Sequence, residues 1–141
     1  APPEVLVLGR AGAGKTLLVR RLRREAAGPS APTSSKGDFN PRTLSTIGVE
    51  VDDLERNGRS VRLREVGHPM ASMWPAYFAG ACGLLYVVDA AEASAASAAQ
   101  EELRGIMAAP DMRGKPVIVV LNKSDAAGEE RLARVCAALG L

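Results

Sequence analysis

The 141-residue sequence predicts an α/β fold, in which a mainly parallel sheet carries one antiparallel edge strand and helices cover both faces. Apolar runs of strand length alternate with helical segments along the chain. Residues 84–89 and 117–121 are continuous apolar runs, which are typical of central strands in a parallel sheet. Upstream of both, Asn57-Gly58 separates two segments of alternating polarity, and this pattern predicts a hairpin that supplies the antiparallel pair.

The remaining elements follow from local patterns. Residues 4–8 are an apolar strand, and residues 15–26 have the spacing of a helix. Residues 27–40 are rich in small, polar and proline residues, so we expect a flexible loop that buries little. The alanine-rich residues 92–108 predict a second helix and residues 128–139 a third. In a parallel sheet the carboxyl ends of the strands lie at the same edge. We therefore expect the loops that follow these strands to meet at that edge.

The composition fits one globular domain over residues 1–141. Hydrophobic residues make up 47% of the chain and charged residues 24%, which is enough apolar side chain for a core. A net charge of +2 gives no case for nucleic acid as a partner. No apolar run reaches the length of a membrane span, so we expect membrane contact only through segments not present in this chain. We expect the domain to be a monomer.

Residues 9–16 carry the strongest chemical signal in the chain. They read Gly-Arg-Ala-Gly-Ala-Gly-Lys-Thr, and they fit G-x-x-x-x-G-K-S/T between a predicted strand and a predicted helix. Glycines allow successive N–H groups to face inward as an anion nest, and the helix N-terminus adds positive potential. This pattern predicts the P-loop NTPase three-layer fold. The candidate phosphate-binding residues are Gly9, Arg10, Ala11, Gly12, Ala13, Gly14, Lys15 and Thr16, with Lys15 on the phosphates and Thr16 also on Mg²⁺.

The predicted strand 117–121 runs into a second motif, which indicates the base. Kinases, ATPases and GTPases all use the phosphate loop, whereas Asn122-Lys123-Ser124-Asp125 fits the N-K-x-D element of GTP-binding proteins. The Asp125 carboxylate can accept two hydrogen bonds from the guanine edge, and adenine presents a different pattern there. Asn122 would brace the pocket, and the stem of Lys123 would cover one face of the base. A nucleotide kinase is disfavoured because residues 90–116 offer no arginine-rich lid.

Four segments of the chain resemble the Ras-like small GTPases and, within them, the ADP-ribosylation factor (Arf-like) branch. They are residues 9–16, residues 45–48 (Ser-Thr-Ile-Gly), residues 74–89 with Trp-Pro-Ala-Tyr-Phe and Gly-Leu-Leu-Tyr-Val-Val-Asp, and residues 122–125. The likeness extends from residue 4 to residue 139. Residues 14–22 (Gly-Lys-Thr-Leu-Leu-Val-Arg-Arg-Leu) and the Arg-Glu-Val-Gly stretch at 64–67 are also similar to one divergent member of that branch.

The resemblance implies a GTP-dependent switch with GTP, GDP and Mg²⁺ as ligands. Thr46 would give its N–H to the γ-phosphate and its hydroxyl to Mg²⁺, and loss of the γ-phosphate would release its loop. Effector or regulator proteins would bind at residues 41–78. The resemblance also implies that the domain is short at its C-terminus, because a further strand and helix would follow residue 139. It implies a role in intracellular trafficking, with membrane or cilium association as a further expectation. The cytoplasmic location that we expect comes instead from the two cysteines, which lack metal-ligand spacing, and from the absence of a visible signal peptide.

The switch II segment departs from the pattern of the family. The usual D-x-x-G followed by Gln is replaced by Glu65-Val66-Gly67-His68-Pro69. Glu65 would still reach Mg²⁺ through a water, so the predicted metal ligands are Thr16, Thr46 and Glu65. Pro69 has no side chain that orients water, and it favours extended geometry at His68.

Two registers of this segment stay open. In the first, His68 gives the phosphate contact and Pro69 replaces the Gln. In the second, Gly67 gives the phosphate contact, and His68 falls on the Gln position, where it would position water. His68 and Thr46 are therefore the catalytic candidates. A third interpretation makes His68 an exposed loop histidine.

The leading hypothesis is a GTP-binding switch with slow intrinsic hydrolysis, since positioning and charge stabilisation supply most of the catalysis in phosphoryl transfer. The alternative is a non-catalytic pseudo-GTPase that acts as a binding scaffold.

Overall fold

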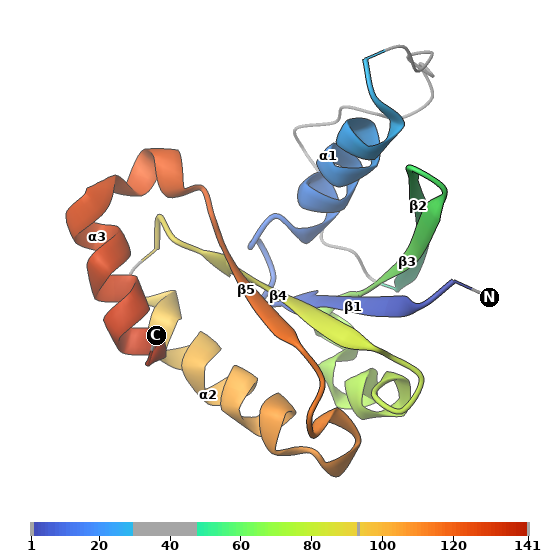
Figure 1. The fold of residues 1–141 in the computed structure, drawn as a ribbon. Helices are drawn as coiled ribbons and strands as arrows, with labels where there is room; N and C mark the ends of the chain where they lie inside the picture. The colour runs from blue at the N-terminus through green and yellow to red at the C-terminus, as the bar shows by residue number, and fades with distance from the viewer. Residues whose placement is uncertain (1, 30–47, 93, 141) are drawn as a thin grey trace.

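The structure is a computed structural model that describes residues 2–29, 48–92 and 94–140. Five strands form one sheet in the order β2-β3-β1-β4-β5 (Figure 1). β1 pairs in parallel with β3 and β4, and β4 pairs in parallel with β5. β2 pairs antiparallel with β3 at one edge of the sheet. The predicted α/β fold with a mainly parallel sheet and one antiparallel edge strand is confirmed. The strands are β1 (Glu4–Gly9), β2 (Val49–Arg56), β3 (Arg59–Val66), β4 (Gly83–Asp89) and β5 (Val117–Asn122).

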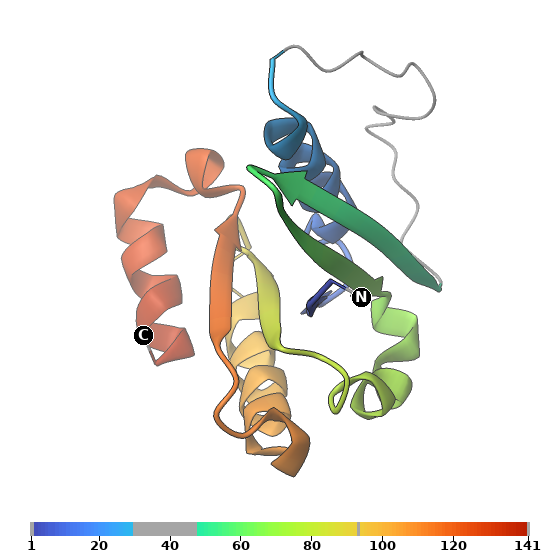
Figure 2. The same ribbon diagram turned by 45° about the vertical axis from the view of Figure 1, so that its right-hand side comes forward.

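Helices lie on both faces of this sheet, as predicted. α1 (Lys15–Ala27) covers one face and α2 (Ala95–Ala108) the other, and α3 (Ser124–Leu139) packs against α2 beside β5 (Figure 2). There are also two 3₁₀ segments. η1 (His68–Tyr77) connects β3 to β4, and η2 (Pro110–Met112) connects α2 to β5. None of the described helices combines the length and the apolar character needed to cross a bilayer.

The core consists of two clusters, one on each face of the sheet. The alternation of β4 shows how the strands separate them: Tyr86 and Val88 belong to the cluster under α2, and Val87 to the cluster under α1. Because successive side chains of a strand point to opposite faces, a continuous apolar run fills both clusters at once. Trp74 of η1 is 3% exposed and completes the larger cluster.

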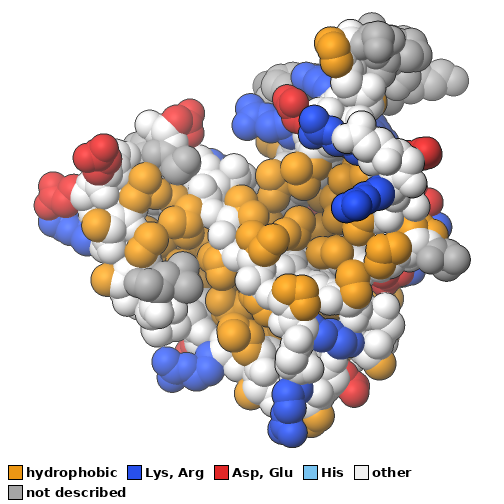
Figure 3. Space-filling model, viewed as in Figure 1, with side chains coloured by type: hydrophobic (Ala, Val, Ile, Leu, Met, Phe, Trp, Pro, Cys, Tyr) orange, Lys and Arg blue, Asp and Glu red, His pale blue; other side chains and the backbone are white. Residues whose placement is uncertain are grey.

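The outer part of the α1 face is less covered. Hydrophobic side chains gather between α1 and α3 in the space-filling view (Figure 3). Ile118 of β5 is 59% exposed there, although the run that contains it has the composition of a central strand. Among the described residues β5 is an edge strand, which explains this exposure.

Two helices begin at other residues than the sequence indicates. α2 starts at Ala95 rather than at residue 92, because the Asp89 Oδ1 accepts the Ala91 N–H at 2.9 Å and holds the preceding residues in a turn. α3 starts at Ser124 rather than at residue 128. Lys123 adopts a left-handed φ of 60° before it, and Gly128 breaks the helix with φ 74°.

The sequence does not predict the 3₁₀ segment η1. The Met70 N–H bonds the Gly67 carbonyl at 2.9 Å, which closes a turn over His68. The expected extended geometry at His68 is therefore wrong, and Pro69 takes a first-turn position of η1, where its missing N–H costs nothing. α1 ends at Ala27. Residues 30–40 of the predicted flexible loop lie outside the described residues.

Candidate functional site

The phosphate-loop motif links β1 to α1, as its sequence predicts. Gly9 has φ 154°, and a Cβ there would lie 2.4 Å from the Val87 carbonyl oxygen of the neighbouring strand. Gly14 has φ 91°, and its Cβ would lie 2.3 Å from the Asn122 Nδ2. Both positions therefore require glycine for space as well as for backbone conformation. Between them, Ala11 and Gly12 are exposed and Ala13 is buried.

Lys15 closes over its own loop. Its Nζ donates to the carbonyls of Gly9 at 3.0 Å and Arg10 at 2.8 Å, and the residue is only 6% exposed. Burial lowers the pKa of the Lys15 ammonium, and the negative charges of Glu65 and Glu102 oppose that lowering. A phosphate would replace the two carbonyls with a stronger, charged acceptor.

Thr16 in the first turn of α1 forms a hydrogen bond with Glu65 of β3. The Thr16 hydroxyl donates to Glu65 Oε1 at 2.6 Å across 49 residues of sequence, and Glu65 is 2% exposed. These are hard oxygen donors that suit Mg²⁺, which is usually held by one or two protein groups, waters and substrate phosphates. In the described part of the chain, no three His, Cys, Asp or Glu side chains form a metal-binding group. The residues present thus fit a magnesium site that a nucleotide phosphate completes.

The second motif lies directly against the phosphate loop. Asn122 Nδ2 donates to the Ala13 carbonyl at 2.9 Å, and Lys123 Nζ donates to the Gly12 carbonyl at 2.9 Å. Lys123 also pairs with Asp89 Oδ2 at 2.9 Å. Asp125, at the start of α3, is exposed, and its carboxylate bonds to none of the described residues. The structure brings together two motifs that are more than a hundred residues apart.

The switch II residues Gly67 and His68 form their hydrogen bonds away from the phosphate loop. The Gly67 N–H donates to the Gly48 carbonyl at 3.0 Å, which extends the β2–β3 ladder. The His68 Nε2 lies 3.1 Å from Glu102 Oε2 of α2, so His68 is not an exposed loop histidine. Neither residue contacts the phosphate loop in this conformation. Thr46 and the rest of residues 41–47 lie outside the described residues.

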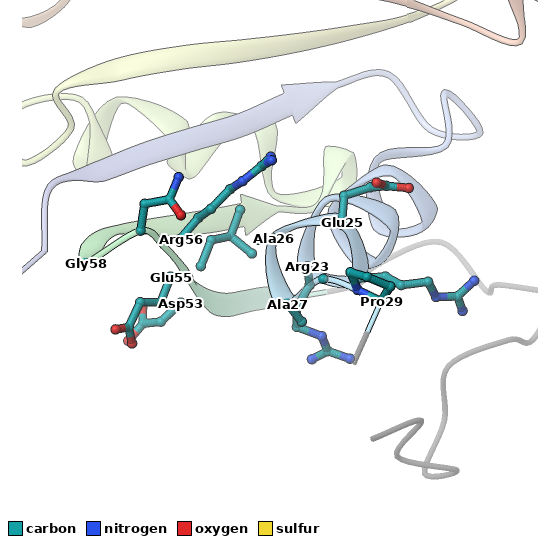
Figure 4. Close-up of a pocket in the computed structure, with 13 residues that line it drawn as sticks. Arg23, Glu25, Ala26, Ala27, Pro29, Asp53, Glu55, Arg56 and Gly58 are labelled. Carbon is teal, nitrogen blue, oxygen red and sulfur yellow. The ribbon is translucent and has the colours of Figure 1, made fainter. Parts of the chain in front are cut away.

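Two hollows lie at opposite ends of α1. A hollow of about 320 Å³ borders the phosphate loop at Arg10, Ala11 and Ala13, and reaches Asp89 and the start of α2. A larger one, of about 1010 Å³, lies between the end of α1 and the β2–β3 turn (Figure 4). Its lining mixes both charges, and the length of α1 separates it from the phosphate loop, so the larger hollow is not part of the site.

Three polar partners in this region escape sequence reasoning. Asp89 follows the apolar run of β4, and its position at a strand end beside the motif is a signal that points to it. Tyr86 lies within the same apolar run, where its position predicts a core residue rather than a polar partner. Glu102 sits in an alanine-rich helix without any local feature that marks it.

The fold matches that of a solved small GTPase. The structure titled "Structure of the Arl6 BBS3 Small GTPase from Trypanosoma brucei with bound nucleotide analogue GppNp" superposes with a TM-score of 0.77 at 18% sequence identity, and covers 99% of this chain and 78% of that one. The fold is therefore that of the small GTPases.

A family model narrows that class. The model described as "ADP-ribosylation factor family" matches residues 3–141. The chain belongs to the ADP-ribosylation factor family.

Two curated human relatives extend the likeness. ADP-ribosylation factor-like protein 16 of Homo sapiens is the divergent member to which residues 14–22 and 64–67 are similar. It is 34% identical over 122 residues, which are 85% of this chain and 59% of that protein. ADP-ribosylation factor-like protein 4D of Homo sapiens is 37% identical over 134 residues, 94% of this chain and 63% of that protein. The chain thus spans about three-fifths of the length of the curated relatives that it matches.

Proposed function

We propose that this chain is a molecular switch that binds GTP and GDP with Mg²⁺. The observation that carries the proposal is the pair of hydrogen bonds from Asn122 and Lys123 to the carbonyls of Ala13 and Gly12. They hold the base motif and the phosphate loop at one edge of the sheet, so that one nucleotide can touch both. Membership of the Arf family supports the same function.

The roles follow from the chemistry of each group. Backbone N–H groups of the phosphate loop and the Lys15 ammonium hold the phosphates. Thr16 and Glu65 would hold Mg²⁺, whose charge would offset that of the phosphates, and Thr46 is the third proposed ligand. Asp125 accepts the guanine N–H groups, and its carboxylate is exposed for that purpose.

Hydrolysis should be slow. A water attacks the γ-phosphorus while the bond to the bridging oxygen breaks, and the products are GDP and phosphate. Pro69 stands near the position where a Gln would orient this water, and the Gly67 N–H is bonded to Gly48. His68 and Thr46 are the catalytic groups that we propose, with His68 as the group that positions water and Gly67 as a phosphate contact once its strand bond opens.

The test is titration of the chain with fluorescent GTP, GDP and ATP in the presence of Mg²⁺. We expect binding of both guanine nucleotides and none of ATP, and Asp125→Ala should abolish the preference, since it removes two hydrogen bonds to guanine. Asp111→Ala is the matched control, because Asp111 is an exposed aspartate of η2 far from the motif. Equal binding of ATP, or an unchanged preference in Asp125→Ala, would contradict the proposal.

A second candidate function is a scaffold that holds nucleotide without turning it over. The bonds of Gly67 to Gly48 and of His68 to Glu102 favour it, because both groups are occupied away from the phosphate loop. Single-turnover hydrolysis of bound GTP separates the two functions. A rate no faster than that of GTP free in buffer would favour the scaffold.

As in other small GTPases, we expect effector or regulator proteins to bind the switch region, and we propose residues 41–78 as that surface. A trafficking role stays a prediction of the family resemblance, and a monomeric state and a cytoplasmic location stay predictions from the sequence.

A further inference from the structure

A chain of polar side chains crosses the cluster beneath α2. The Tyr86 hydroxyl of β4 donates to Glu102 Oε1 at 2.6 Å, and Glu102 Oε2 lies 3.1 Å from His68 Nε2 at the start of η1. The side chains of His68 and Glu102 are 26% and 19% exposed, and Tyr86 is fully buried. Three elements of the fold therefore meet in one hydrogen-bonded line.

Tyr86 fixes the first carboxylate oxygen. Burial raises the pKa of the Tyr86 hydroxyl well above its usual value, and the bond to Glu102 and the charge of Glu102 raise it further. The hydroxyl is therefore protonated at any pH at which the protein works, and it acts as a donor. Oε1 accepts the hydrogen bond from Tyr86, and Oε2 is the oxygen that faces His68.

The His68 ring is held on a second side by Trp74. The two rings meet edge-to-face with centroids 5.6 Å apart and an interplanar angle of 77°. Trp74 is itself fixed, since its Nε1–H bonds the Gly67 carbonyl at 3.3 Å. The Glu102 carboxylate and the Trp74 indole together restrict the rotation of the His68 imidazole.

This arrangement selects one tautomer of His68. A neutral imidazole has one N–H and one lone-pair nitrogen, and a carboxylate accepts but does not donate. Nε2 must therefore carry the hydrogen, and Nδ1 is the acceptor. Among the described residues Nδ1 has no partner.

Charges of the phosphate loop interact with this line of side chains. The negative charge of Glu102 acts on Lys15, and the positive charge of Arg10 acts on Tyr86. Glu65 is the remaining charged group that acts on Lys15. An Nδ1 with a free lone pair can accept a hydrogen bond from a water.

We propose that Glu102, itself oriented by Tyr86, is a positioning residue that holds His68 as the Nε2–H tautomer and directs Nδ1 toward the water that attacks GTP. This inference rests on the proposed GTP-binding function for its substrate. In this proposal His68 Nδ1 accepts a hydrogen bond from the water, and Glu102 acts by orienting the His68 ring.

The first test reads the tautomer directly. His68 is the one histidine of the sequence, so imidazole ¹⁵N NMR shifts report it without assignment. Glu102→Gln offers one acceptor oxygen to two donors, and we expect the ratio of Nε2–H to Nδ1–H tautomer to fall about tenfold. Tyr86→Phe leaves the carboxylate but frees its orientation, and the ratio should fall less. Glu101→Gln, the same change at an exposed neighbour on α2, should leave the ratio as it is.

The second test reads the reaction. Glu102→Gln should slow single-turnover hydrolysis of bound GTP about tenfold, while the dissociation constants of GTP and GDP change by less than about twofold. His68→Ala should be slow as well, and Glu102→Gln should add nothing to it. A merely structural Glu102 would instead slow the His68→Ala chain as much as the parent.

The outcomes separate the two proposals. An unchanged tautomer ratio in both Glu102→Gln and Tyr86→Phe overturns the positioning role, and so does hydrolysis at the parent rate in His68→Ala, even if GTP binds normally. Failure of the unchanged chain to bind guanine nucleotide overturns the proposed function. The tautomer ratio of the nucleotide-free chain then still tests the hold of Glu102 on His68.

Discussion

The two halves of the candidate site are held in different ways. On the phosphate and base side, most bonds run from side chains to backbone carbonyls, as from Lys15 to Gly9 and Arg10 and from Asn122 to Ala13, and the pair of Lys123 with Asp89 is the exception. On the switch II side, two of the bonds join one side chain to another, Thr16 to Glu65 and His68 to Glu102. The first half follows its family pattern at every fixed position, whereas the second departs from it.

This difference shows which parts of the site tolerate substitution. A bond to a backbone carbonyl depends on the path of the chain, so its donor must match a fixed loop. A bond between two side chains can be rebuilt with another pair of residues, since neither end depends on a fixed backbone carbonyl. We therefore expect substitutions of the phosphate-loop residues Lys15 and Gly14 to have the larger effects, and four changes test that expectation from the largest effect to the smallest.

Lys15→Ala should have the largest effect. It removes the one ammonium of the phosphate loop, and GTP affinity should fall about 100-fold, or roughly 3 kcal/mol. Fluorescent nucleotide titration measures it. Arg24→Ala is the control, because Arg24 is an exposed cation at the far end of the same helix. If Lys15→Ala loses less than about threefold in affinity, the phosphate side does not dominate.

Gly14→Ala should rank second. The new Cβ would collide with Asn122 Nδ2 at 2.3 Å in addition to the strain of φ 91°, so the free energy of unfolding should fall by about 2 kcal/mol. Gly12→Ala is the matched control: its φ is 79°, but nothing lies within 4 Å of the added Cβ. The difference between the two chains in urea unfolding measures the collision alone. With Asn122→Ala in the background that difference should vanish, and a difference that persists would place the collision elsewhere.

Trp74→Phe should have an intermediate effect on stability and little effect on nucleotide binding. It opens a cavity beneath η1 and removes the indole bond to the Gly67 carbonyl, which together should lower the free energy of unfolding by about 1.5 kcal/mol. Thermal unfolding with nucleotide titration measures both quantities. Met73→Leu serves as control, since Met73 is 51% exposed on the same segment. A tenfold loss of GTP affinity in Trp74→Phe would show that the two halves are coupled.

Lys123→Ala should have the smallest effect on folding. The Lys123–Asp89 pair is partly exposed, and such pairs contribute roughly 0.5 kcal/mol. The loss should shrink at high salt, because salt screens surface pairs. Urea unfolding at low and high salt checks both points. A loss above about 2 kcal/mol that salt does not change would mean that the bond to Gly12 matters more than the ion pair.

Sequence reasoning succeeds where the signal is local. Strand runs, the Asn57-Gly58 turn and the two nucleotide motifs each occupy a few consecutive residues, and all of them lie where the sequence places them. It fails at η1, where a turn bond from Met70 to Gly67 overrides the preference of the residue before Pro69. It also fails at Glu102, whose partner is 34 residues away.

The sequence by itself determined the class of fold, the two motifs of the candidate nucleotide site and the family, because periodicity, glycine spacing and motif order are properties of short segments. Only the tertiary structure decided that Asn122 braces the phosphate loop at Ala13, that Glu65 meets Thr16, and that His68 belongs to Glu102 rather than to solvent. These pairings depend on how strands and helices pack across the sheet, and no segment of a few residues contains that information.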